Sequence, residues 1–121
     1  MVAIEQRGGG APEAGLRIET RDGPDGWTLV ALQGELDLGE AEEATRALAA
    51  ALDGARGGIV ADLSALDFLG STGVRVLIDA SADALARGLG FRTIPGDGPA
   101  WRVIDMLGLG ERLGVEAGPP A

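Results

Sequence analysis

Three side chains that carry much of protein chemistry are missing from this sequence of 121 residues, which has no cysteine, no histidine and no lysine. Without cysteine there can be no disulfides, thiol nucleophiles or thiolate metal sites. Without histidine, Ser-His and Cys-His nucleophile pairs and imidazole metal ligands are excluded, which leaves carboxylates as the side-chain option for a metal. Without lysine there is neither a Walker-type phosphate loop nor Schiff-base chemistry, and neither Gly-x-Gly-x-x-Gly nor Gly-x-Ser-x-Gly occurs.

Aromatic residues and long apolar runs are also scarce. The aromatic side chains are Trp27, Phe68, Phe91 and Trp101, so we expect an aliphatic core. No apolar run has the length of a membrane span, and the N-terminal stretch lacks the apolar segment of a signal peptide. The formal net charge is −9 and every base is an arginine, so anionic lipid and nucleic acid should repel the chain. We expect a soluble cytoplasmic protein with no direct nucleic-acid partner and no membrane insertion.

The chain length fits one domain. Residues 1–15 contain a triple glycine and show no apolar period, which predicts a disordered N-terminal tail, and residues 117–121 read as a C-terminal tail. The domain itself is expected over residues 16–116. It begins with two alternating segments, 16–20 and 27–33, separated by turn formers, a pattern that predicts a β-hairpin.

A helix is predicted after the hairpin. Asp37 is placed to cap it, with Glu40 three residues later completing a capping box. The predicted apolar stripe, which ends near Gly54, consists of Ala41, Ala44, Leu48, Ala51 and Leu52. Five carboxylates crowd this region and raise the alternative of a cation site: Glu35, Asp37, Glu40, Glu42 and Glu43. We favour capping and the helix dipole as the reason for these acids, and we expect no metal and no cofactor.

The organising stretch of the chain runs from Ile59 to Ala80 and predicts a strand, a tight turn and a helix. The strand residues are almost continuously apolar, as in a strand covered on both faces. The predicted inward face of the helix comprises Val74, Leu77, Ile78, Ser81 and Leu85. Ser71 and Thr72 fall at the helix start, where backbone N–H groups lack partners and the dipole is positive. Two interpretations stay open for them: an ordinary N-cap, or a position that accommodates a phosphate.

The remaining third of the chain predicts a strand over 89–95 and a helix that begins at Pro99. The buried face of this helix is expected to comprise Ala100, Val103, Ile104 and Leu107, with Trp101 packing at its rim. A last short strand is predicted at 113–116. Strands that alternate with helices require crossover connections, so we expect an α/β fold with a mixed, mostly parallel sheet of four to five strands.

Two motifs together resemble the signature of the STAS domain, the family of bacterial anti-sigma factor antagonists. The first is Gly34-Glu35-Leu36-Asp37-Leu38, and the second is Asp62-Leu63-Ser64 followed by Leu66-Asp67-Phe68-Leu69-Gly70-Ser71-Thr72-Gly73-Val74. The resemblance covers residues 16–116 and implies the STAS fold. It also implies that Ser71 is the phosphorylated serine, with Thr72 as second choice. The sequence departs from the family pattern at Gly70, where the family usually has aspartate.

The implied function is that of an interaction module in transcription regulation by partner switching. Such a protein binds an anti-sigma factor that resembles a Ser/Thr protein kinase and so frees a sigma factor, and a Ser/Thr phosphatase is a further implied partner. Asp37 and Asp62 are expected near one surface, because the carboxyl ends of parallel strands meet at one edge, although capping and turn formation would also explain them. The predicted partner-binding residues are Asp37, Asp62, Gly70, Ser71, Thr72, Gly73 and Arg75.

Two alternatives to this function remain. One is a non-catalytic STAS subunit that docks constitutively in a larger assembly, such as a lipid-transport or stress-signalling complex. The other is a small hydrolase that uses Ser71 as its nucleophile. The second lacks a histidine or lysine to activate the hydroxyl, so we expect that the protein is not an enzyme.

Overall fold

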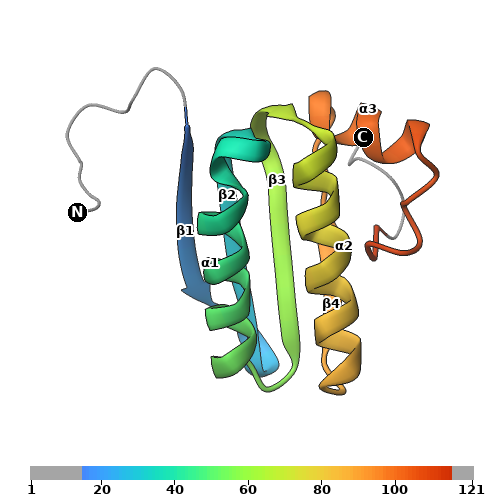
Figure 1. The fold of residues 1–121 in the computed structure, drawn as a ribbon. Coiled ribbons are helices and arrows are strands. Elements are labelled where there is room, and N and C mark those ends of the chain that lie inside the picture. The colour runs from blue at the N-terminus through green and yellow to red at the C-terminus, as the bar shows by residue number, and fades with distance from the viewer. Residues whose placement is uncertain (1–14, 116–121) are drawn as a thin grey trace.

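The computed structural model describes residues 15–115, which form one four-stranded sheet with its helices packed against it (Figure 1). The strand order is β1-β2-β3-β4, with β1 antiparallel to β2 and the other neighbours parallel. The strands are β1 (Leu16–Asp22), β2 (Trp27–Leu36), β3 (Gly58–Leu69) and β4 (Gly90–Ile94). The predicted α/β fold with a hairpin and a mostly parallel sheet is confirmed. The predicted tails lie outside the described residues, apart from Gly15.

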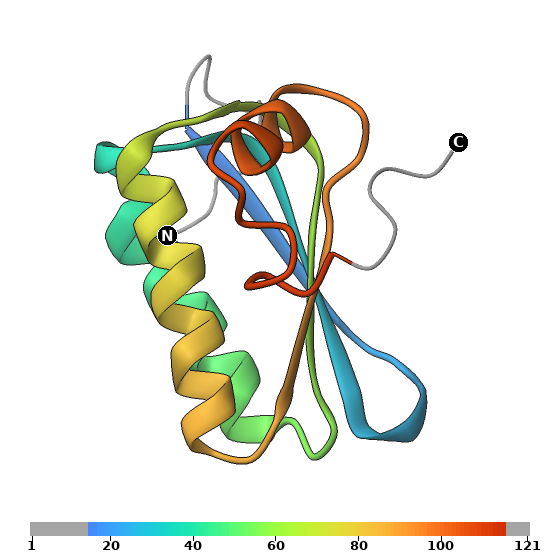
Figure 2. The same ribbon diagram turned by 90° about the vertical axis from the view of Figure 1, so that its right-hand side faces the viewer.

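Three α-helices and two short 3₁₀ helices complete the fold. They are η1 (Pro24–Gly26), η2 (Leu38–Glu40), α1 (Ala41–Gly54), α2 (Ser71–Ala86) and α3 (Pro99–Met106). In Figure 2, α1 and α2 lie on the same face of the sheet. The prediction that β3 is covered on both faces is therefore wrong, and the outward-facing Val60 and Asp62 are only half-buried. No helix within residues 15–115 is long and apolar enough to cross a membrane.

The core between the sheet and the helices is aliphatic, as predicted. Fully buried leucines come from every layer of it: Leu32, Leu36, Leu48, Leu52, Leu63 and Leu77. Burying each such side chain contributes about 1.5–3 kcal/mol, so this layer is the main source of stability. Each of the two Trp residues lies partly exposed at the margin, and Trp101 packs against the core from the rim as expected.

Three local predictions need correction. Leu85, predicted to face the core, is 78% exposed, because α2 buries the stripe of Val76, Ala80 and Ala84 instead. Leu107 lies just beyond the end of α3 and is 55% exposed. Residues 113–115 form the end of a turn instead of a strand, and Glu116 lies outside the described residues. That turn still packs, because the Thr93 hydroxyl donates to the buried Leu113 carbonyl at 2.6 Å.

The strand β3 is longer than the sequence indicates, and two irregularities bend it. The register between β2 and β3 shifts once between Ala31 and Gln33 and again between Gly34 and Glu35, and β3 has one extra residue at each shift. Such bulges increase strand bending and twist. Figure 1 shows the far end of β3 curving over toward the start of α2. The bulges therefore help to place the chain that follows β3 at the start of the second helix.

Candidate functional site at the carboxyl ends of β2 and β3

The strands β2 and β3 end side by side, and this brings the two sequence motifs together. Leu36 pairs with Leu69 in the register. One residue farther on, the Gly70 N–H donates to the Leu36 carbonyl at 3.0 Å. The chain after β2, which begins with Asp37, and the chain after β3, which begins with Gly70 and Ser71, thus leave the sheet from neighbouring positions.

Ser71 is the first residue of α2 and is exposed. The N-cap position belongs to Gly70, whose backbone is extended (φ −90°, ψ 176°) and whose carbonyl accepts the first helical bond from the Val74 N–H at 3.0 Å. Neither Ser71 nor Thr72 acts as the N-cap, so the capping interpretation does not explain the two hydroxyls. Among residues 15–115, the Ser71 hydroxyl has no hydrogen-bond partner. It is free to meet a partner protein.

Burial increases along the two residues that follow Ser71. Thr72 is half-buried and Gly73 is fully buried. A Cβ on Gly73 would lie 2.8 Å from Leu36 Cγ and 2.9 Å from Leu69 Cδ1, and closer still to the Leu36 carbonyl oxygen. Glycine at this position lets α2 start directly against the ends of both strands. Gly73 therefore shapes the site from beneath, and Ser71 is the hydroxyl that the surface presents.

Asp37 fulfils its predicted capping role and also contacts the second motif. Its backbone N–H donates to Glu40 Oε1 at 3.1 Å, and the two residues form a capping box at the start of η2. Its carboxylate lies against Gly70, so that a Cβ on Gly70 would lie 2.6 Å from Asp37 Oδ2 and closer still to Oδ1. A carboxylate from the end of β2 is therefore held beside the residue that precedes Ser71.

Asp62 does not belong to this surface. It lies in the middle of β3, paired with Ala31 and Ile94, seven residues before the strand ends. At about 3.3 Å per residue, that separation is roughly 23 Å. Its Oδ1 accepts hydrogen bonds from the Ser64 N–H (3.0 Å) and the Ser64 hydroxyl (2.7 Å), next to the first bulge. Asp62 thus makes local hydrogen bonds at a bulge inside β3, so it forms neither a cap nor a turn, and it lies apart from Ser71.

Arg75 lies one helical turn after Ser71 on the exposed side of α2. Residues four apart on a helix share a face, so the two side chains border the same surface. Arg75 takes part in none of the ion pairs found among residues 15–115. Its guanidinium is available to an acid on a partner.

Two exposed apolar side chains near Ser71 were not identified from the sequence as binding residues. Leu38, next to Asp37, is 77% exposed, and Phe68, three residues before Ser71, is 48% exposed. A signal for both was present, because Leu38 precedes the apolar stripe of α1 and Phe68 falls between the core positions Leu66 and Leu69. Large apolar side chains exposed beside a polar site are typical of protein-binding surfaces.

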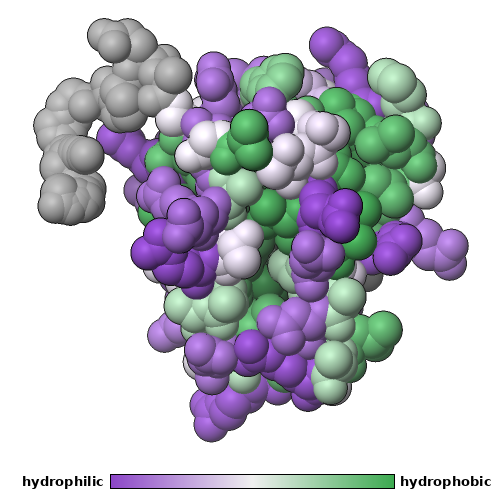
Figure 3. All heavy atoms as spheres, in the orientation of Figure 1, coloured by the Kyte–Doolittle hydropathy of each residue, from purple (hydrophilic) through white to green (hydrophobic). Residues whose placement is uncertain are grey.

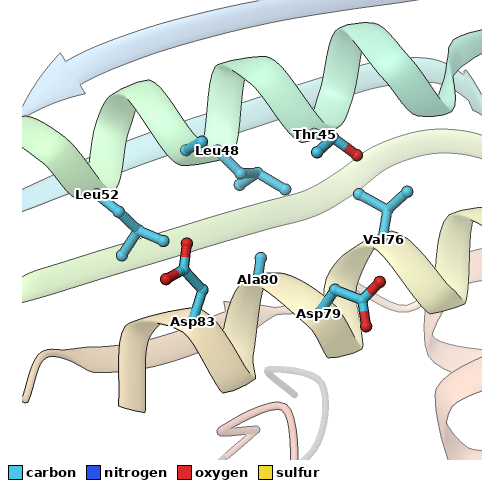
Figure 4. Close-up of a pocket in the computed structure, with 8 residues that line it drawn as sticks. Thr45, Leu48, Leu52, Val76, Asp79, Ala80 and Asp83 are labelled. Atoms are coloured by element: carbon cyan, nitrogen blue, oxygen red, sulfur yellow. The ribbon is translucent and has the colours of Figure 1, made fainter. Parts of the chain in front are cut away.

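No metal centre accompanies this surface in the part of the chain that the structure describes. An open hollow of about 330 Å³ lies away from it, beside the hairpin, and is lined among others by Arg21, Trp27 and Val60. Between residues 15 and 115, no three acidic side chains are grouped closely enough to hold a metal ion, so the cation alternative gains no support. Figure 4 shows a groove of about 120 Å³ between α1 and α2, lined by Leu48, Leu52, Val76, Ala80 and the carboxylates of Asp79 and Asp83. Pockets for drug-sized ligands occupy about 300–1,000 Å³. This groove is too small for such a ligand.

The surface around α2 is divided by polarity. In the view of Figure 3, apolar surface gathers at the upper right, over α3 and the turns that follow it, and the lower part is mostly hydrophilic. The exposed apolar residues of that region include Met106 and Leu107 at the end of α3. The exposed apolar surface of this view thus belongs to α3 and the turns after it.

Comparisons with known proteins agree on one family. The family model described as "Mlab, STAS domain" matches residues 20–114. An anti-sigma factor antagonist from Mycobacterium paratuberculosis is 30% identical, with a TM-score of 0.72 and 84% of each chain covered. The phosphorylated form of SpoIIAA, a cell fate determinant of Bacillus, is 26% identical, with a TM-score of 0.60 over 78% of this chain and 86% of that one.

A more distant likeness concerns the fold alone. The murine anion transporter Slc26a9 is 17% identical, with a TM-score of 0.64 over 79% of this chain and 16% of the transporter. No protein of curated function matches the chain.

Proposed function

Because this chain belongs to the STAS domain family, we propose that it is an anti-sigma factor antagonist, which binds an anti-sigma factor in the cytoplasm and so releases a sigma factor. The carrying observation is the exposed Ser71 hydroxyl at the start of α2. The comparison that supports the role is the 30% identity to an anti-sigma factor antagonist over 84% of this chain. The protein acts by binding, with no catalytic step of its own.

The proposed contact surface consists of Ser71 and its neighbours from η2, β3 and α2. Leu38 and Phe68 supply exposed apolar area, and Asp37 and Asp67 add acidic groups. An interface of this kind buries its apolar centre and leaves charges at the rim. The complementary partner surface is apolar at its centre and basic around it. Unmodified Ser71 is small and neutral, so covering it costs little desolvation.

Phosphorylation of Ser71 is the proposed switch, and the anti-sigma factor is the proposed kinase. The γ-phosphoryl group of ATP is transferred to Ser71 Oγ, the hydroxyl proton passes to a base on the kinase, and ADP leaves. A Ser/Thr phosphatase hydrolyses the ester and restores the hydroxyl. The 26% identical SpoIIAA has been solved in a phosphorylated form, which supports a switch of this type.

The expected effect of the phosphate is loss of binding with retention of the fold. The group adds about −1.5 to −2 charges, and a like-charge or desolvated placement in an interface costs several kcal/mol. Stability should be kept, because the Ser71 hydroxyl has no hydrogen-bond partner between residues 15 and 115. A helix start also tolerates an anion.

The alternative is a STAS subunit that stays docked in a larger assembly, such as a lipid-transport or stress-signalling complex. The family model that matches residues 20–114 is described as "Mlab, STAS domain" and names no anti-sigma factor antagonist, which leaves room for this alternative. The two functions differ in one respect: the docked subunit needs no change of state at Ser71.

The deciding experiment is the intact mass of the protein from its native host, with fragmentation across residues 68–75. A phosphate on Ser71 is expected. A phosphate on Thr72 would move the switch by one residue, and an unmodified protein under every growth condition would favour constitutive docking.

Binding to the co-purified partner gives an independent test. Ser71→Asp should weaken binding by roughly a hundredfold, since several kcal/mol correspond to two decades or more. Ala82→Asp adds the same charge at an exposed position farther along α2 and should leave binding unchanged. Equal affinities of the two variants would remove Ser71 from the interface.

A further inference from the structure

Asp37 and Gly70 occupy one another's space. The carboxylate of Asp37 fills the volume that a side chain at position 70 would need, with both of its oxygens within 2.6 Å of the Cβ position. Gly70 is buried and its φ of −90° is accessible to any residue. Backbone strain is therefore not what calls for glycine here. Glycine is needed at position 70 because the Asp37 carboxylate occupies the space of a side chain.

The position of Asp37 is fixed by its own segment. Its backbone N–H donates to Glu40 Oε1, and its carbonyl accepts from the Glu40 N–H at 3.1 Å. Its side chain completes the capping box of η2. These two bonds hold the backbone of Asp37, so its carboxylate lies within the short reach of an aspartate side chain from the start of α2.

We propose that Asp37 is the charge that a phosphate on Ser71 meets first, and that glycine at position 70 is what allows Asp37 to lie there. This inference rests on the proposed phosphorylation of Ser71. In the unmodified protein, the carboxylate packs over Gly70 and holds η2 against the start of α2. After modification, the phosphate on Ser71 lies next to the Asp37 carboxylate, which contacts the preceding residue Gly70. Repulsion between the two negative groups pushes the Asp37 side chain outward. The segment that carries the exposed Leu38 is thereby coupled to the state of Ser71.

Other charges surround the same surface and must be separated from this effect. The charged residues nearest to Ser71 on the elements that meet there are Glu35 from β2, Glu40 from η2, Asp67 from β3 and Arg75 from α2, whereas Asp62, Asp79 and Asp83 lie farther along β3 and α2. Glu40 is engaged in the capping box, and Asp67 is exposed. Asp37 differs from them in touching Gly70, the residue bonded to Ser71.

The first test measures the phosphate directly. Phosphoserine is incorporated at position 71 during translation, and its second pKa is followed by ³¹P NMR titration. A nearby carboxylate disfavours the dianion and raises this pKa, so Asp37→Asn should lower it by about half a pH unit or more. Asp67→Asn removes one acid from the same end of the sheet and should shift it less. No shift in Asp37→Asn, or a shift no larger than in Asp67→Asn, would overturn the proposal.

The second test concerns the packing of the pair and needs no phosphate. Gly70→Ala should lower the melting temperature, because the new Cβ collides with the Asp37 carboxylate. Gly39→Ala is the matched control. It adds a methyl group in η2, where no atom lies within 4 Å of the Cβ position. In the Asp37→Ala background, Gly70→Ala should lower the melting temperature much less. Equal losses in both backgrounds would show that Asp37 does not determine residue 70.

The proposed switch at Ser71 and the proposed role of Asp37 can fail independently. If the protein is never phosphorylated in its host, the proposed switch fails, whereas the NMR and melting tests still measure how Asp37 acts on residues 70 and 71. If those tests fail while Ser71 is phosphorylated in the host, the switch stands and the role of Asp37 is wrong.

Discussion

Ser71 and Gly73 are two residues apart in the sequence, yet different physical constraints act on them. Ser71 is exposed and its hydroxyl is unbonded within residues 15–115, whereas Gly73 is buried under the ends of two strands. The hydroxyl is thus open to chemistry at no structural cost. The glycine is required by packing. The one sequence motif thus contains an exposed hydroxyl, which is the proposed phosphorylation site, and a glycine that lets the helix pack closely against the strands.

Gly73→Ala should destabilise the protein. Alanine favours a helix over glycine by about 1 kcal/mol, but the added methyl group would overlap Leu36 and Leu69, and overpacking of this kind costs about 1–3 kcal/mol. We expect a net loss in the free energy of unfolding, measured by urea denaturation.

Gly54→Ala is the matched control for this change. Gly54 is the last residue of α1 and has no atom within 4 Å of its Cβ position. The helix preference should act alone there, and the free energy of unfolding should stay the same or rise. A neutral Gly73→Ala variant would mean that the end of β2 yields to the methyl group.

Ser71→Ala should be silent for stability. With no hydrogen bond lost and little area buried, the free energy of unfolding should change by less than about 0.5 kcal/mol. The same variant should incorporate no phosphate at this site. A loss of 1 kcal/mol or more would indicate that the hydroxyl has a structural partner.

At the scale of elements, α1 and α2 are joined at their far ends by Arg87. Its guanidinium donates to Asp53 of α1 at 2.7 Å and to Asp83 of its own helix at 3.1 Å. The hydrogen bonds with Asp53 and then Asp83 raise the pKa of Arg87. A raised pKa means that the contribution to stability is present below the ordinary pKa of arginine and is lost only above it. Arg87 therefore adds no pH dependence near neutrality.

The contribution of the Arg87–Asp53 ion pair to the melting temperature should depend on salt concentration. Arg87→Gln should lower the melting temperature slightly at 10 mM salt, where charges interact over about 30 Å, and much less at 1 M, where the range is about 3 Å. Arg75→Gln is the control, because Arg75 lies on the same helix and has no ion pair within the described residues. An Arg87 effect that does not depend on salt would point to lost packing of its stem.

The sequence predicted elements where the signal is strong and local, as in the hairpin, in the Asp37–Glu40 capping box of η2, in α1 and in the start of α2. The sequence-based prediction failed where two neighbouring apolar residues fit a helical stripe equally well and only the tertiary packing determines which one is buried. Leu85 and Ala84 both fit an apolar stripe, but in the packed structure Ala84 is buried and Leu85 is exposed. Asp62 was misplaced because a strand with two bulges is longer than its apolar run suggests.

The residues of the site could be predicted from local motifs, but the contacts between them could not. Ser71 and Asp37 could be found from their motifs, because each motif ends an element. The contact between Asp37 and Gly70 could not, since it depends on how two strands distant in sequence align their ends. Leu38 gave a weak signal, and only its exposure of 77% identifies it as surface.

At the scale of the whole molecule, both helix starts and both strand ends that define the site lie at one end of the sheet, and the hairpin turn lies at the other (Figure 1). The chain carries a net charge of −9, and acids such as Asp67 are exposed at the site. A basic partner should therefore be steered toward this end during association.

The association rate with the anti-sigma factor should fall as salt rises, while the dissociation rate changes little. Asp67→Asn should slow association a few-fold at low salt, measured by stopped flow. Asp22→Asn removes the same charge from the hairpin end and should have little effect. If both variants slowed association equally, net charge alone would be responsible.

The exposed first position of α2 has a consequence for how such a protein can change over generations. Because the core does not depend on the Ser71 side chain, a single codon change could remove the proposed switch without lowering the yield of folded protein. A regulated antagonist would become a permanent binder in one step, and the reverse change would be equally simple. Lineages could thus gain or lose control at this residue without passing through an unstable ancestor.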